Sequence, residues 1–157
     1  MKDVAVRNTP RNGKGVVGMK LWTKELEEAA KKVPLYCDTC KPYATRKILV
    51  KYFYPCGAAT WYITEVDPKE FEMQDGRKTK YLYGYVTLDG RDYEWGPVLL
   101  AELEDFKGRF GLGIERDLSF SPLEEELGKY RKELVEEDKE REAAERARKE
   151  KQDAQNA

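Results

Sequence analysis

Histidine is absent from this chain of 157 residues, and cysteine occurs only three times. Without histidine the chain cannot build a Ser-His-Asp triad, a Cys-His pair or a histidine-led zinc site, so hydrolases of these classes are excluded. Any catalysis would depend on carboxylates, Lys, Arg, Tyr, Cys or a metal ion held by oxygen atoms. The odd number of cysteines fits a reducing compartment better than a disulfide framework.

The sequence also lacks a long apolar run. No stretch reaches the ~18 apolar residues that span a bilayer, and the N-terminus lacks the apolar core of a signal peptide. We therefore expect a cytoplasmic protein with no membrane partner. A length of 157 residues suits one domain whose core needs no disulfide.

An excess of either charge is missing as well, because the formal net charge is -1 although 38% of the residues are charged. The charges are distributed unevenly: residues 1–20 are mainly basic, and residues 124–157 are mainly acidic. Nucleic acid would therefore have to bind at a local basic patch, since no global positive field attracts it.

Residues 1–20 combine basic side chains with proline and glycine and show no lasting periodicity, which predicts a mobile basic arm. Residues 13–18 match the G-x-G-x-x-G pattern of dinucleotide-binding sites. No strand is predicted before this segment, so we interpret the match as accidental.

Residues 21–122 have the pattern of a single α+β domain. Thr23 is a suitable N-cap for a helix that ends before Pro34. Alternating residues separated by turn signals predict a small antiparallel meander sheet of four to five strands, the last at 114–120. A short helix is expected near 99–106.

The segment Thr60-Trp61-Tyr62-Ile63-Thr64-Glu65 is expected to form a strand in the middle of this sheet. Strict alternation places Glu65 on the same face as Trp61 and Ile63. The carboxylate would then lie at the edge of the core, where its charge needs a partner or contact with water.

Residues 123–157 are predicted to form a long charged helix whose distal end is solvated. Leu123, Leu127, Tyr130 and Leu134 form an apolar seam at its start. This seam predicts either docking onto the domain or a short coiled-coil contact that would make a homodimer.

The three cysteines include a C-x-x-C motif at Cys37 and Cys40, followed by Cys56. A structural zinc site needs four ligands, whereas a redox C-x-x-C motif normally opens a helix after a buried strand. Because Pro34 and Pro42 predict a loop, we interpret all three as ordinary loop cysteines and expect no metal and no cofactor.

Tyr81, Tyr83 and Tyr85 alternate along one predicted strand and would form an aromatic row on one face. With Lys78 and Lys80 beside it, the row would suit single-stranded nucleic acid, at about 1–3 kcal/mol for each stacked base. Alternatively, the row packs beneath a helix.

Five segments together resemble domain-of-unknown-function family 2958, whose short members are typical of plasmids, integrative elements and phages: Leu21–Leu26, Trp61–Glu65, Tyr83–Val86, Leu100–Leu103 and Gly111–Leu118. The resemblance covers about residues 21–122, and Gly111–Leu118 is its most specific part. It leaves out the arm, the charged helix and the cysteines. The resemblance implies a mobile-element accessory protein and supplies no mechanism. The positions it highlights are Trp61, Tyr62, Glu65, Gly84, Glu102, Glu115, Arg116 and Asp117.

Three functions are compatible with these patterns. The leading hypothesis is a non-enzymatic binding module that acts for a mobile element on a host defence or DNA-processing protein. The second is single-stranded nucleic-acid binding through the tyrosine row. The third is a metal-assisted carboxylate enzyme, with these candidate acids: Glu65, Glu102, Glu115 and Asp117. The alternative for these acids is a structural network in which Arg116 pairs with Glu65 or Glu102.

Overall fold

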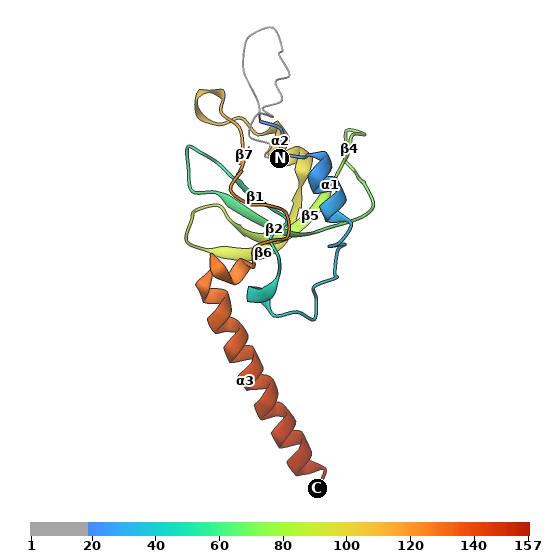
Figure 1. Ribbon diagram of the computed structural model, residues 1–157, viewed down its shortest axis with the longest axis vertical. Coiled ribbons are helices and arrows are strands. Elements are labelled where there is room, and N and C mark those ends of the chain that lie inside the picture. The colour runs from blue at the N-terminus through green and yellow to red at the C-terminus, as the bar shows by residue number, and fades with distance from the viewer. Residues whose placement is uncertain (1–18) are drawn as a thin grey trace.

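The computed structural model describes residues 19–157, in which a twisted antiparallel sheet carries a long projecting helix (Figure 1). Five strands form the sheet in the spatial order β6-β5-β2-β1-β7. In chain order they are β1 (Val50–Phe53), β2 (Thr60–Val66), β5 (Tyr81–Thr87), β6 (Tyr93–Leu99) and β7 (Glu115–Arg116). A separate hairpin pairs β3 (Phe71–Glu72) with β4 (Lys78–Thr79). The α+β prediction is confirmed, and β2 is the central strand as expected.

Three α-helices and three 3-10 turns complete the part of the chain that the structure describes. The helices are α1 (Lys24–Ala30), α2 (Leu100–Asp105) and α3 (Lys132–Gln155), and the turns are η2 (Tyr43–Thr45), η3 (Arg109–Gly111) and η4 (Leu127–Lys129). The predicted cap of α1 is confirmed, because Oγ1 of Thr23 accepts a hydrogen bond from the N–H of Leu26 at 3.1 Å. The short helix predicted near residues 99–106 is α2. No helix within residues 19–157 is both long enough and apolar enough to cross a membrane.

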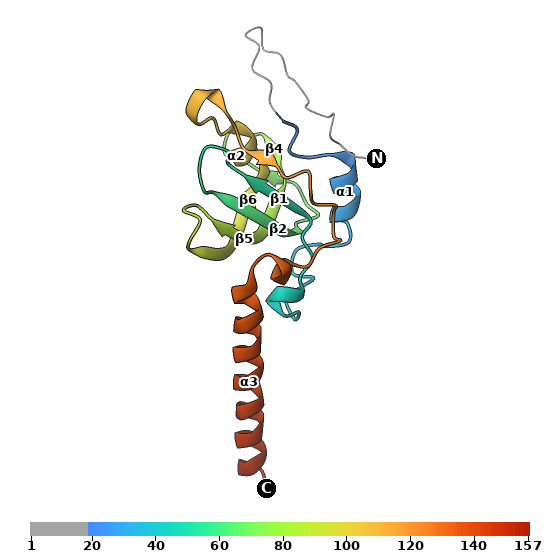
Figure 2. The ribbon, with the colours of Figure 1, turned by 60° about the vertical axis from the view of Figure 1, so that its left-hand side comes forward.

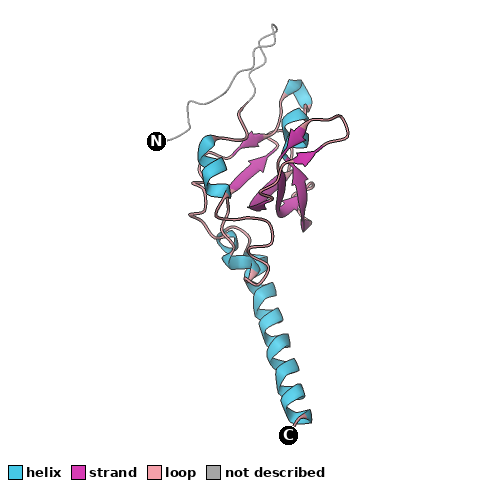
Figure 3. Ribbon diagram, turned by 90° about the vertical axis from the view of Figure 1, so that its right-hand side faces the viewer, coloured by secondary structure: helices cyan, strands magenta, loops and turns pink. Residues whose placement is uncertain are grey.

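The two faces of the sheet have different coverings. We call one the helical face, because apolar side chains of α1 and α2, including Leu26, Leu100 and Leu103, pack there with Trp61 and Ile63. We call the other the tyrosine face. Its buried residues are Ile48, Tyr62, Tyr85, Leu127 and Leu134, and its covering consists of η2, η4 and the base of α3. Figure 3 shows the strands lying between the helices and turns that cover the two faces, and α3 projecting away from the domain.

A β-bulge in β2 changes the face on which Glu65 lies. Ile63 pairs with Gly84 and Glu65 pairs with Tyr83, so Thr64 is an extra residue without a partner in the register. Because facing residues of an antiparallel pair share a side, Glu65 joins Tyr83 on the tyrosine face. The predicted alignment of Glu65 with Trp61 and Ile63 is therefore wrong.

The long helix begins at Lys132, nine residues later than the predicted start at 123. Leu123 has a φ of 64°, which no right-handed helix contains. The N–H of Leu123 bonds to the carbonyl of Ile48, and that of Leu127 bonds to the carbonyl of Arg46. These bonds tie the segment to the stretch before β1, and Figure 2 shows α3 projecting beyond it.

The apolar seam docks onto the domain, which is one of its two predicted uses. Leu127 and Leu134 have no exposed surface, and Tyr130 is 39% exposed. The last predicted strand, at 114–120, is also shorter than expected, because only Glu115–Arg116 forms it. Most of the predicted arm, and the whole G-x-G-x-x-G match at 13–18, lie outside the described residues.

Candidate functional site

The buried carboxylate of Glu65 lies beside an arginine that the sequence did not single out. Nη1 of Arg46 is 3.9 Å from Oε2 of Glu65, and the two residues are only 5% and 2% exposed. The Arg46 guanidinium lies 4.9 Å from the ring centroid of Tyr43 and 4.8 Å from that of Trp95. The cation thus lies beside two neighbouring aromatic rings, whose centroids are 5.2 Å apart, and next to a buried acid.

Glu65 is almost completely buried, which limits contact between its carboxylate and a substrate. Its carboxylate also accepts a hydrogen bond from the backbone N–H of Tyr36. Burial raises the pKa of Glu65, although the Tyr36 N–H and the charge of Arg46 act in the opposite direction. The predicted partner Arg116 is wrong for Glu65: its guanidinium Nε–H instead donates to the carbonyl of Lys20 at 3.3 Å.

The tyrosine row exists, but its ring faces are occupied. Tyr83 stacks on Trp95 with an interplanar angle of 16°, and Tyr85 stacks on Tyr93 at 22°. Tyr81 packs against Phe71. A nucleic-acid base needs an open ring face to stack upon, and these contacts remove much of that surface.

Cations near the tyrosine face are paired with carboxylates of the chain. The Arg131 guanidinium lies 3.7 Å from the ring centroid of Tyr93 and bonds to Glu133. The other pairs are Lys51 with Asp117 at 3.3 Å and Lys80 with Glu27 at 2.9 Å. These pairs reduce the positive charge that could contact phosphate groups, and Lys80 turns to α1 on the helical face; no ion pair is found for Lys78 within residues 19–157.

The four acids proposed for an enzyme do not converge. Glu102 is exposed on α2, whereas Glu65 is buried on the tyrosine face. Glu115 pairs with Phe53 across β7 and β1, and Asp117 bonds to Lys51 and Ser119. Among residues 19–157, no group of three or more Cys, Asp or Glu side chains is arranged to hold a metal ion.

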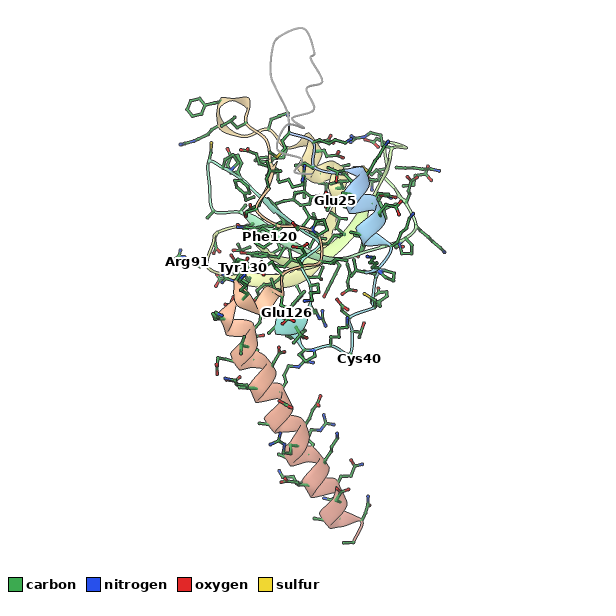
Figure 4. All side chains as sticks on the ribbon, viewed as in Figure 1. Glu25, Cys40, Arg91, Phe120, Glu126 and Tyr130 are labelled. Carbon is green, nitrogen blue, oxygen red and sulfur yellow. The ribbon has the colours of Figure 1, made fainter. Side chains whose placement is uncertain are left out.

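Cysteine chemistry also receives little support from the geometry. All three cysteines are free and exposed, and Figure 4 shows Cys40 on a loop away from the sheet. Partial burial, together with the nearby charge of Asp38, raises the pKa of Cys37 to about 11. A thiol with so high a pKa is a weak nucleophile at neutral pH.

A groove of about 760 Å³ opens at the helical face, beside β6 and α2. Trp61, Val98 and Leu103 are buried parts of its lining. Two further apolar side chains in the lining are exposed, Leu88 by 75% and Phe106 by 43%. Exposed apolar side chains around a hollow indicate a surface that can bind another molecule.

The groove has an acidic rim, and neither Lys nor Arg from residues 19–157 contributes to its lining. The rim acids are Asp89, Asp92, Glu94 and Glu102. The carboxylate of Asp89 accepts hydrogen bonds from the backbone N–H groups of Asp92 and Arg91, which lower its pKa. Asp89 is therefore ionised at neutral pH and also shapes the turn between β5 and β6.

Strand β6 forms one side of the groove and is an edge of the sheet. Gly96 belongs to the lining, and an added Cβ there would meet no atom within 4 Å. The N–H of Leu100 bonds to the carbonyl of Lys80, the residue before β5. Because backbone groups alternate in direction along a strand, the backbone groups of Glu94, Gly96 and Val98 also point toward β5. The backbone groups of Trp95 consequently point away from the sheet.

Sequence reasoning missed both Arg46 and most of the groove. Arg46 has no local signal, because the residues that enclose it come from η2, β2 and β6. Leu88 did carry a weak signal, since it is a large apolar residue directly before the Asp89-Gly90 turn. Trp61, Tyr62, Glu65 and Arg116 were predicted as site residues, and all four are buried.

Comparisons with known proteins give one match. A family model described as "Protein of unknown function (DUF2958)" matches residues 38–139, whereas no curated protein and no solved structure matches the chain. The match begins later than residue 21 and ends later than residue 122, so it includes Cys40, Cys56 and the start of α3. It covers well over half of the sequence and agrees with the resemblance found in the sequence. The chain therefore belongs to the DUF2958 family of proteins of unknown function.

Proposed function

We propose that this protein is a non-enzymatic binding module whose groove beside β6 and α2 receives a segment of a partner protein. The observation that carries the proposal is the exposure of Leu88 and Phe106 beside an apolar hollow. Burying apolar surface contributes about 25 cal/mol per Å², so a partner that covers these side chains gains binding free energy.

The alternatives have weaker geometric support. Within the tyrosine row, Tyr83 stacks on Trp95 and Tyr85 stacks on Tyr93, which leaves little room for bases. The carboxylates proposed for catalysis are separated between two faces of the sheet and its edge strand. The family resemblance adds a finer proposal: the protein acts in the cytoplasm for a mobile element, on a host defence or DNA-processing protein.

A displayed library of random peptides tests the groove directly. We would select peptides on the wild-type protein and screen them against Gly96→Leu, whose added side chain projects into the open space at Gly96. Gly96 has no positive φ, so leucine is compatible with the backbone there. Gly96→Ala is the matched control, because a methyl group fills little of the groove.

The proposal predicts peptides that bind the wild type and Gly96→Ala and lose at least about tenfold in affinity for Gly96→Leu. Circular dichroism and thermal unfolding would verify that both variants are folded. Selected peptides that bind Gly96→Leu as tightly as the wild type, or a selection without specific binders, would contradict the groove as a binding site.

A further inference from the structure

We infer that the segment received by the groove is basic as well as apolar, with Lys or Arg side chains placed against the acidic rim. The inference rests on the proposed function of the groove as a protein-binding site. Four carboxylates belong to the lining, those of Asp89, Asp92, Glu94 and Glu102, and no cationic side chain of the described residues does. A rim of one charge sign beside an apolar wall concentrates oppositely charged groups.

Three of the rim acids, Asp92, Glu94 and Glu102, have no cation paired with them among the described residues, whereas several acids elsewhere on the surface do. Examples of paired acids elsewhere are Glu27 with Lys80, Asp105 with Arg77 and Asp117 with Lys51. Across the described part of the chain, no ion pair joins Asp92, Glu94 or Glu102 to a lysine or arginine. The charge of these three carboxylates is thus available to a partner.

The rim and the walls together define the chemistry of the occupant. The side chains of Leu88 and Phe106 favour apolar residues, which lose water when they enter the groove. The carboxylates repel nucleic-acid phosphates, acidic peptides and anionic membrane surfaces, because like charges brought together raise the free energy of binding. A peptide with an apolar centre and Lys or Arg at its ends satisfies both parts of the groove.

Fluorescence anisotropy with three short labelled peptides tests the inference. Each peptide has the same central block of leucine and valine, and its ends carry lysine, serine or glutamate. The full chain is compared with a rim variant, Asp92→Asn/Glu94→Gln/Glu102→Gln, and with Gly96→Leu. The matched control variant, Glu136→Gln/Glu140→Gln/Glu142→Gln, changes the net charge equally but lies on the exposed part of α3.

We expect the lysine peptide to bind the wild type at least about tenfold more tightly than the glutamate peptide. Its affinity for the wild type would fall with added salt, because salt screens the rim charges. Its affinity for the rim variant would be about tenfold lower than for the wild type, because three rim charges are removed. The control variant would bind it within about twofold of the wild type.

Other outcomes overturn the inference in distinguishable ways. The serine or glutamate peptide could bind the wild type as tightly as the lysine peptide does and fail to bind Gly96→Leu. The groove would then bind protein segments, but the inferred basic chemistry would be wrong. If none of the peptides distinguishes the wild type from Gly96→Leu, the proposed function fails together with the inference. A dimer in sedimentation equilibrium that Gly96→Leu abolishes would identify a second copy of this chain as the occupant instead.

Discussion

The Arg46 guanidinium and the Glu65 carboxylate form an ion pair beneath the covering of the tyrosine face, with 3.9 Å between Nη1 and Oε2. The β-bulge at Thr64 creates this pair, because it moves Glu65 from the helical face to the face that Arg46 occupies. Both charges have left water, and aromatic rings rather than further acids surround the guanidinium. The pair therefore serves the fold, and its two members are not equally replaceable.

Replacing Arg46 by methionine leaves Glu65 as a buried acid without a cation. We expect Arg46→Met to lower the free energy of unfolding at neutral pH by about 3 kcal/mol, since an uncompensated buried charge is costly. Urea denaturation measures the change. The control is Lys139→Met, which removes an exposed partner of Glu136 and should cost less than about 0.5 kcal/mol. Equal stability of Arg46→Met and the wild type would show that Arg46 does not stabilise the buried carboxylate of Glu65.

Replacing Glu65 by glutamine is expected to change stability in a pH-dependent way, because the raised pKa of Glu65 couples its protonation to folding. Burial raises the pKa of Glu65 above its usual value, so the folded state binds this proton more tightly than the unfolded chain does. Stability contributed by the neutral form is present below the unfolded pKa and is lost as pH rises through the raised pKa. Glu65→Gln, which mimics the neutral form, should match the wild type at acid pH and become relatively more stable above that pKa.

Urea denaturation of both proteins at several pH values distinguishes the two possibilities for this carboxylate. A wild type that gains stability relative to Glu65→Gln as pH rises would mean that Arg46 lowers the pKa more than burial raises it.

Elements with a strong local pattern could be predicted from the sequence. The alternation in Tyr81–Thr87 and the Asp89-Gly90 turn correctly predicted β5 and the hairpin to β6. Thr23 correctly marked the start of α1, because an N-cap is a contact between near neighbours in the chain. In these cases the residues that determine the structure lie within a few positions of one another.

Features that depend on distant segments could not be predicted. Leu123 and Leu127 fit a helical period, yet their N–H groups bond to carbonyls of Ile48 and Arg46 far earlier in the chain. The groove likewise depends on α2 lying beside the β5–β6 hairpin, which brings Phe106 and Leu88 to one hollow. A bulge such as that at Thr64 moves a side chain to the other face without changing the residue pattern.

The base of α3 is attached to the domain through Asp138. Its two carboxylate oxygens accept hydrogen bonds from the N–H groups of Tyr43 and Ala44, each at 2.8 Å. We expect Asp138→Ala to lower the free energy of unfolding by about 1–2 kcal/mol, as loss of a helix cap does. Hydrogen exchange at the amides of Tyr43 and Ala44 should become faster. Asp153→Ala, near the exposed end of α3, is the control and should change stability by less than about 0.5 kcal/mol. Unchanged exchange at Tyr43 and Ala44 would contradict this attachment.

Cys37 should react slowly with alkylating reagents. Its thiol has a pKa raised to about 11, first by burial and then by the charge of Asp38. The thiolate is the reactive form, so the alkylation rate should keep rising as pH increases toward that value. Mass spectrometry of the peptide that contains Cys37 measures the rate, with Cys37→Ser confirming the assignment and Asp38→Asn expected to raise it. A rate that levels off near neutral pH would indicate an activated thiol and reopen a redox role.

Two glycines that face each other across β5 and β6 should respond differently to the same substitution. A Cβ at Gly84 would lie 2.0 Å from the backbone oxygen of Tyr62, whereas one at Gly96 would meet nothing within 4 Å. Gly84→Ala must therefore push β5 away from β2, and we expect it to lower the free energy of unfolding by about 1–3 kcal/mol. Gly96→Ala should stay within about 0.5 kcal/mol of the wild type. Denaturant unfolding of the two variants gives the comparison, and an equal loss at both positions would mean that the space beside Gly96 is not open.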